Sequence, residues 1–259
     1  MIEIVNLSKS FGEHKVLDNL NLMVKTGETK VIIGRSGCGK SVLLKHIIGL
    51  MRPDQGRVLI DGLEINDFTD KELNKFRLRA KIGMLFQGGA LFDSLTVAEN
   101  VAFILEEYTD LSKSTVRKKA KEALGLVGLE GIEELMPAEL SGGMKKRVSL
   151  ARAICMGPKI ILYDEPTTGV DPITADAIND LIIELHDKLK VTSLVVTHDI
   201  NSAYKVADRI SMLYRGRIIA DGTPSDIRNS QDSVVQQFIH GSATGPITEE
   251  EHLIFGHIE

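Results

Sequence analysis

The stretch that decides the fold is Gly34-Arg35-Ser36-Gly37-Cys38-Gly39-Lys40-Ser41, which fits the phosphate-binding pattern G-x-x-x-x-G-K-[ST]. The apolar residues 29–33 before it are typical of a buried strand, and the apolar segment from Val42 is a good helix opening. In that context glycines turn successive backbone N–H groups inward, and the helix N-terminus adds its positive dipole. We therefore expect a phosphate-binding loop, with Lys40 on the β- and γ-phosphates and the Ser41 hydroxyl on Mg²⁺.

The bulk composition is that of a soluble protein with a substantial core. The chain has 259 residues, 43% of them hydrophobic, which is enough for one large domain or two small ones. A net charge of −5 argues against a large nucleic-acid footprint. The two cysteines, Cys38 and Cys155, make no disulfide framework, which fits a reducing cytosol. No signal peptide and no apolar run of roughly 18 residues is present, so we expect any membrane role to come through a partner.

Strand patterns and helix patterns alternate along the chain, which favours an α/β fold with a parallel core sheet and right-handed crossovers. The runs typical of buried strands are residues 29–33, 81–86, 159–163 and 192–197, and half-buried or edge strands are expected at 2–7, 16–24, 57–60 and in a hairpin over 210–220. Residues 88–158 show helical periodicity and no strong strand pattern. We interpret this block as an inserted helical subdomain.

Four predicted strands end in polar residues suited to nucleotide chemistry, namely the strands before Gly34, Gln87, Asp164 and His198. Ligands of open α/β sheets bind at the carboxyl ends of strands, so these residues should meet at one edge. There Asp164 would hold Mg²⁺, and Glu165 would orient and deprotonate a water. His198 would contact the γ-phosphate, and Gln87 both metal and water. Taken singly, each has a plain structural alternative as a polar strand end.

A second anion site is indicated by Leu140-Ser141-Gly142-Gly143-Met144. Ser141 is a suitable N-cap for a helix that runs to Cys155, and the glycines expose N–H groups at its positive end. The alternative is a plain helix cap. One chain with one phosphate loop has no obvious use for two such sites, whereas a symmetric head-to-tail dimer does. We therefore expect two copies, each completing the nucleotide site of the other.

These motifs, in this order, resemble those of the ATP-binding-cassette (ABC) ATPases over about residues 1–240. The resemblance implies an α/β P-loop NTPase (RecA-like) fold with a parallel-sheet core, an N-terminal antiparallel β subdomain and the inserted α-helical subdomain 88–158. It also implies hydrolysis of ATP, with Mg²⁺, by a sandwich homodimer.

The resemblance assigns roles residue by residue. Catalysis is assigned to Lys40, Gln87, Glu165 and His198, and the metal to Ser41, Gln87 and Asp164. Nucleotide binding is assigned to Phe11 as the ring on adenine, and to Gly34, Arg35, Ser36, Gly37, Cys38, Gly39, Lys40, Ser41, Val42, Ser141, Gly142, Gly143 and Asp171. Of these, Ser141 and Gly143 would contact the γ-phosphate of the neighbouring copy, and Asp171 would lie in the inter-subunit loop.

Three positions depart from the commoner family pattern. Val42 replaces a hydroxyl residue, which removes one α-phosphate contact, and Met144 stands where many members have Gln. The loop Gly169-Val170-Asp171-Pro172 replaces the commoner Ser-Ala-Leu-Asp type. None of these changes removes a catalytic group, so we expect an active enzyme.

Within the family, three segments look like the ATPases of mammalian-cell-entry (MCE) or Mla-type phospholipid-trafficking systems: residues 85–92, 136–144 and 169–174. This resemblance implies an integral-membrane permease, an MCE-domain substrate-binding protein, often a small STAS-domain subunit, and a place on the cytoplasmic side of the inner membrane. An importer of amino acids or other small solutes is the alternative. An ABC protein that remodels nucleic acid or ribosomes is disfavoured, because the chain has one cassette and an acidic balance.

The tail, residues 241–259, lies beyond the expected ATPase domain and carries the apolar Leu253-Ile254-Phe255. A frayed terminus is the plain interpretation. The alternative is an arm that packs on the neighbouring subunit or on a small partner.

Overall fold

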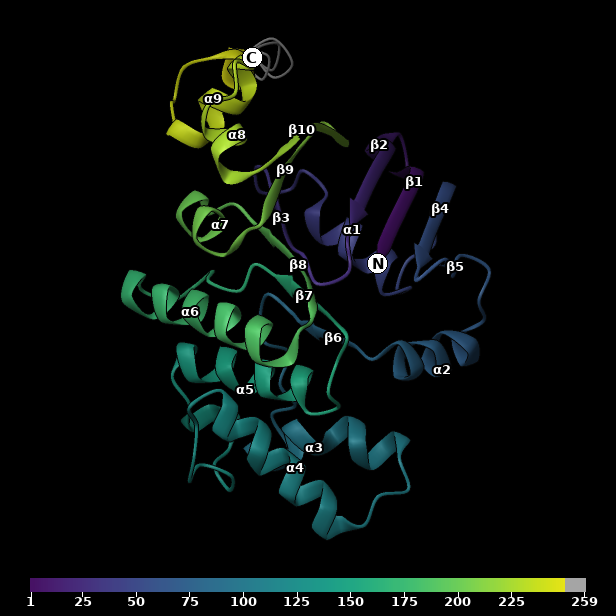
Figure 1. Ribbon diagram of the computed structural model, residues 1–259, viewed down its shortest axis with the longest axis vertical. Helices are drawn as coiled ribbons and strands as arrows, with labels where there is room; N and C mark the ends of the chain where they lie inside the picture. The colour runs from purple at the N-terminus through teal and green to yellow at the C-terminus, as the bar shows by residue number, and fades with distance from the viewer. Residues whose placement is uncertain (250–259) are drawn as a thin grey trace.

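The structure is a computed structural model that describes residues 1–249, apart from the side chains of residues 78 and 79. In this range the chain forms two sheets, with helices between and around them (Figure 1). The predicted tail segment Leu253-Ile254-Phe255 lies outside the described residues. None of the helices between residues 1 and 249 combines the length and apolar character that crossing a bilayer requires.

The core is a six-stranded sheet in the order β10-β9-β3-β8-β7-β6. Neighbouring strands from β6 to β9 run parallel, and β10 closes the edge as the second arm of a β9–β10 hairpin. The strands are β3 (Thr29–Ile33), β6 (Ile82–Leu85), β7 (Ile160–Asp164), β8 (Thr192–Thr197), β9 (Arg209–Tyr214) and β10 (Arg217–Gly222). Every residue of β3, β7 and β8 is buried, as expected of parallel strands covered on both faces.

The second sheet is antiparallel, in the order β2-β1-β4-β5, and is built from the N-terminal part of the chain. Its strands are β1 (Ile2–Phe11), β2 (His14–Val24), β4 (Gln55–Ile60) and β5 (Leu63–Glu64). Helix α1 (Lys40–Ile47) lies between the two sheets, because its buried Leu43, Leu44 and Ile47 share one apolar cluster with residues of both. The start of α1 is thereby fixed beside both sheets.

Between β6 and β7 the chain is helical, with α3 (Val97–Tyr108), α4 (Lys113–Leu126), the 3-10 turn η1 (Pro137–Glu139) and α5 (Gly142–Ile154). Thr96, Ser112 and Ser141 cap the three α-helices by accepting a hydrogen bond from the third N–H of each helix. Helix α5 packs on β6 as well as on α3 and α4, so it joins these helices to the core sheet. Figure 1 shows α3 and α4 at the end of the molecule far from β1 and β2.

The remaining helices are α2 (Asp70–Ala80), α6 (Pro172–Leu189), α7 (Ile200–Val206), α8 (Pro224–Arg228) and α9 (Ser233–His240). The first residues of the tail pack against α9. Buried Ile247 belongs to the main apolar core, and its N–H donates to Gln237 Oε1 at 2.7 Å. The chain is therefore ordered past residue 240.

The α/β class and the parallel core sheet expected from the sequence are confirmed. Several strands are longer than expected, and β1 differs most. β1 continues to Phe11 rather than ending at residue 7, because register shifts against β2 let the pairing extend. Within the block 88–158 expected to be helical, the first α-helix begins only at Val97, because Thr96 and Glu99 form a capping box there.

Candidate functional site

A cavity of about 380 Å³ lies at the carboxyl ends of the parallel strands, at the start of α1. Its lining includes Phe11, Ser36, Gly37, Gly39, Lys40, Ser41, Val42, Gln87, Glu165 and His198, all of which the sequence assigned to nucleotide work. The structure thus brings together residues from β1, the glycine loop and the ends of three strands.

The glycine loop lines this cavity with Ser36, Gly37 and Gly39. Gly37 and Gly39 have positive φ, 80° and 108°, which residues with a Cβ rarely adopt. At Gly39 a Cβ would also lie 3.0 Å from Val16 Cγ1, against β2. Gly39 is the N-cap of α1, yet no side chain caps this helix. The positive end of α1 is therefore open to an anion.

Lys40 is folded into the loop it follows, with 5% of its surface exposed. Its Nζ donates to the carbonyls of Gly34 at 2.7 Å and Arg35 at 3.0 Å, and lies 3.3 Å from Glu165 Oε1. A phosphate in the glycine nest would offer this ammonium an anionic acceptor in place of neutral carbonyls.

Ser41 and Asp164 meet as a hydroxyl and a carboxylate suited to Mg²⁺. Ser41 Oγ donates to Asp164 Oδ1 at 2.8 Å, and Gln87 lines the same cavity. Burial raises the pKa of the Asp164 carboxyl above its usual value, partly opposed by the hydrogen bond from Ser41. Residues 1–249 hold no cluster of three or more His, Cys, Asp or Glu that would bind a metal alone. A Mg²⁺ ion here fits only with phosphate or water oxygens completing its shell.

Glu165 presents its carboxylate to the cavity from an unusual backbone. Its φ is 49°, in the left-handed region, and its N–H donates to the carbonyl of Val196 at 2.9 Å. The carboxylate lies 2.9 Å from His198 Nδ1, and Oε2 accepts from Thr168 Oγ1 at 3.1 Å. With 6% of its surface exposed, this group is placed to take a proton from a water held beside a terminal phosphate.

Phe11 ends β1 at the mouth of the cavity, with 48% of its surface exposed. Lys9 Nζ lies 5.8 Å from the centroid of the Phe11 ring. Its exposed face is available to stack on a planar base.

The second anion motif does not line this cavity. Ser141 is exposed, and its Oγ accepts from the N–H of Met144 at 3.3 Å, as a cap of α5. Asp171 caps α6, accepting from the N–H groups of Ile173 and Thr174 at 3.0 Å each. The two helix starts adjoin, because a Cβ on Gly143 would lie 2.6 Å from Thr174 Cγ2. They form one surface that is not part of the lining of the cavity beside the chain's own glycine loop.

Sequence reasoning missed three groups around Glu165: Thr168, Thr197 and Lys146. Both threonine hydroxyls contact Oε2, at 3.1 and 3.4 Å, and Lys146 reaches the carbonyl. The two threonines lie in the sequences Thr-Thr and Val-Val-Thr, and neither sequence indicates a contact with Glu165. Lys146 had a signal, since it and Arg152 are the two cations among the otherwise apolar or small buried residues of α5.

The family model, the sequence relatives and the solved structures that match this chain all point to the same protein family. A family model described as "ABC transporter" matches residues 17–168. The intermembrane phospholipid transport system ATP-binding protein MlaF of Haemophilus influenzae is 43% identical over 247 residues, covering 95% of this chain and 93% of MlaF. The probable ribonucleotide transport ATP-binding protein mkl of Mycobacterium tuberculosis is 43% identical over 250 residues, covering 96% of this chain and 69% of mkl.

Among solved structures, an ATP-binding cassette in a dimeric post-hydrolysis state, bound to ADP and Pi, matches with a TM-score of 0.79 and 39% identity. The match covers 86% of this chain and 99% of that cassette. At this identity the likeness extends beyond the fold to the amino-acid sequence.

Replacing Asp164 by Asn is expected to raise the melting temperature of the nucleotide-free protein at neutral pH. Burial raises the pKa of the carboxyl in the folded state, so its ionised form lowers stability at every pH above that pKa. We expect a gain of a few degrees, since about 1 kcal/mol shifts the Tm of a domain of this size by about 2–4 °C. The gain should vanish on acidification toward 3.8, the ordinary value for aspartate, as the wild-type carboxyl becomes protonated.

Thermal melts of both proteins across neutral and acidic pH check this expectation. Asp93→Asn, at an exposed carboxylate outside the cavity, is the control and should leave the melting temperature unchanged. A wild type that is the more stable protein at neutral pH, or a gap that does not change with pH, would contradict it.

Proposed function

We propose that this chain, which belongs to the ABC transporter family, is the ATP-hydrolysing subunit of a complex that moves phospholipid through a partner permease. The chain is an ATPase of this family. The observation that carries the proposal is the single cavity in which Lys40, Ser41, Glu165 and His198 meet at the end of the parallel sheet.

In this proposal the glycine nest and Lys40 bind the β- and γ-phosphates of ATP, and Phe11 stacks on the adenine. Ser41, Asp164 and Gln87 would hold Mg²⁺, which supplies positive charge to the phosphate oxygens. Glu165 orients the attacking water and accepts its proton. His198, whose Nδ1 lies 2.9 Å from the Glu165 carboxylate, links that base to the γ-phosphate.

We further propose that two copies form a head-to-tail dimer. The surface that carries Ser141, Gly143 and Asp171 offers an uncovered helix start but lies outside the chain's own cavity. Each of these surfaces would close the nucleotide site of the other copy, with Asp171 in the inter-subunit loop. The solved cassette with 39% identity is itself a dimer, which supports this arrangement.

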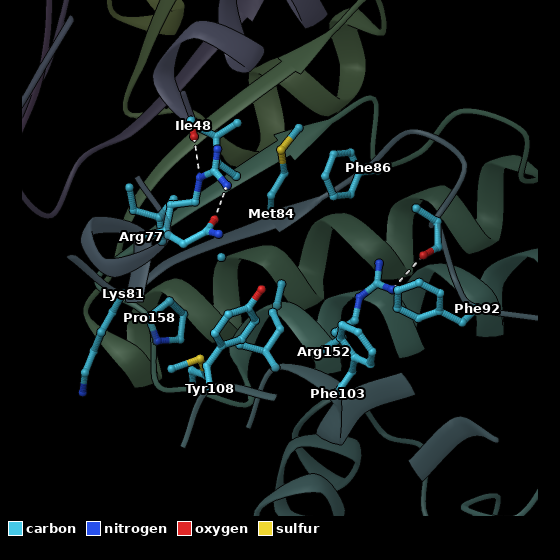
Figure 2. Close-up of a pocket in the computed structure, with 17 residues that line it drawn as sticks. Ile48, Arg77, Lys81, Met84, Phe86, Phe92, Phe103, Tyr108, Arg152 and Pro158 are labelled. Atoms are coloured by element: carbon cyan, nitrogen blue, oxygen red, sulfur yellow. Dashed lines mark hydrogen bonds between the residues drawn. The ribbon is translucent and has the colours of Figure 1, made fainter. Parts of the chain in front are cut away.

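A second cavity, of about 450 Å³, offers a docking site for the permease (Figure 2). It lies between α2, β6, α3 and α5, and its floor and walls are largely apolar, including Met84, Phe86, Phe92, Phe103 and Tyr108. The ring centroids of Phe92 and Phe103 lie 4.6 Å apart. Phe92 is 43% exposed and Tyr108 is 51% exposed. An open aromatic groove of this kind fits a short amphipathic helix of a partner.

Phospholipid is the proposed cargo because of how the relatives align. MlaF and mkl share the same 43% identity with this chain, but the match spans 93% of MlaF and only 69% of mkl. The chain therefore corresponds to a nearly whole MlaF, whose name states phospholipid transport. We extend the proposal to an MCE-domain substrate-binding protein, a small STAS-domain subunit and a place on the cytoplasmic face of the inner membrane.

Mass spectrometry of the membrane complex recovered with the full chain tests the cargo and the partners. We expect an integral-membrane permease, an MCE-domain protein and bound phospholipid in the same preparation. A complex that instead contains a periplasmic binding protein and a small solute, without lipid, would overturn the phospholipid assignment while leaving the ATPase in place.

Phe92→Asp is expected to lower recovery of the permease with this chain about tenfold or more, because a central aromatic anchor contributes about 2 kcal/mol or more to an interface. Leu63→Asp is the matched control, since Leu63 is 49% exposed but lies on β5, away from the groove. Both variants should bind ATP as the wild type does. Equal recovery of permease by the two variants would show that the groove is not its docking site.

A further inference from the structure

Lys146 is a buried cation that the nucleotide site itself does not use. It lies on α5 with 7% of its surface exposed and does not line the nucleotide cavity. Its Nζ donates to two main-chain carbonyls, that of Glu165 at 3.2 Å and that of Gln87. Burial lowers the pKa of this lysine, and the carboxylates of Asp164 and Glu165 oppose that shift. A buried ammonium is costly unless it is hydrogen-bonded, so these two carbonyls are its essential partners.

The carbonyl of Glu165 belongs to a residue with a strained backbone. Its φ is 49°, in the left-handed region, and its carbonyl accepts from Lys146 on α5. The N–H on the other side of the residue donates to Val196. With both neighbouring peptide groups held, the carboxylate is directed at Lys40 and His198, 3.3 and 2.9 Å away.

The carbonyl of Gln87 belongs to the segment 86–90, whose main-chain carbonyls accept hydrogen bonds from side chains of α5. Lys146 holds the carbonyl of Gln87, Ser149 that of Gly89, and Arg152 those of Gly89 and Ala90. The side chains of Phe86 and Ala90 line the apolar groove, while Gln87 lines the nucleotide cavity. This segment therefore lies between the two cavities.

We propose that Lys146 is a positioning residue for ATP hydrolysis. By holding the carbonyls of Glu165 and Gln87 with one ammonium, it fixes the direction of the Glu165 carboxylate relative to segment 86–90. A displacement of that segment when the groove is filled reaches the carboxylate through Lys146. The inference rests on the proposed role of Glu165 as the base.

Lys146→Met tests this in the full chain, with steady-state ATP hydrolysis as the readout. We expect kcat to fall about tenfold or more, because a displacement of about 1 Å at a catalytic group costs up to about 10²-fold. The KM for ATP should change less than about twofold, because the phosphate-binding groups stay in place. Lys146→Arg should restore at least about half of kcat, since a guanidinium also donates to two carbonyls.

Two controls separate positioning from a merely structural role. Lys119→Met makes the same change on the exposed face of α4 and should keep the wild-type kcat and KM. Lys146→Gln removes the charge and places its donor one bond closer to the backbone, so it should lose the double contact; it replaces the methionine variant, with the same expected fall in kcat, if that protein does not fold. Fluorescent-ATP binding confirms that each variant is folded.

A wild-type kcat in Lys146→Met would overturn the proposal. So would a fall in kcat of the same size in Lys146→Arg, or a Lys146→Met variant whose main change is a raised KM for ATP. Glu165→Gln separates the two levels of the account. If that variant stops hydrolysing ATP while Lys146→Met hydrolyses normally, only the positioning role fails. If Glu165→Gln still hydrolyses ATP, the assigned base fails and the positioning role fails with it.

Discussion

The parallel register of three strands is the constraint on which the rest of the structure depends. Val196 in β8 pairs with Ile32 in β3 on one side and with Asp164 in β7 on the other. The strands therefore end at the same level, and the chain leaves each of them into the same space. Because a ladder of backbone hydrogen bonds in a buried sheet holds this register, the glycine loop, the carboxylates and His198 meet at one edge of the sheet. Contacts such as that between Lys40 and Glu165 then form among them.

The site that results contains groups that lower the stability of the nucleotide-free protein and that suit the binding of an anion. A buried carboxylate with a raised pKa, a non-glycine residue in the left-handed region and an uncapped helix start all occur within it. Each of these features is unfavourable in the folded protein without nucleotide, and each is suited to binding an anion together with its metal. The surrounding sheets and α1 hold these groups in place, because the apolar cores on both faces leave the strand ends no freedom to relax.

The sequence was sufficient where the signal is local. The glycine loop carries its own spacing, and the apolar run before Asp164 identifies a buried strand, so the fold class and the residues around the cavity followed directly. It was insufficient where a residue acts across the chain. Lys146 contacts carbonyls 59 and 19 residues away, and no periodicity encodes such a pairing. The extension of β1 to Phe11 likewise depends on register shifts against β2 that composition does not reveal.

The central claim is that Lys40 of one copy and Ser141 of the other hold the same nucleotide, and tethered dimers test it most directly. The measurement is the amount of ATP stably bound per dimer. If one copy carries Lys40→Ala and the other Ser141→Ala, both losses fall on one site, so the account predicts one bound ATP. If a single copy carries both changes beside a wild-type copy, each site loses one group and the account predicts none. The reverse result would contradict the account, because it would mean that Ser141 serves the nucleotide of its own chain.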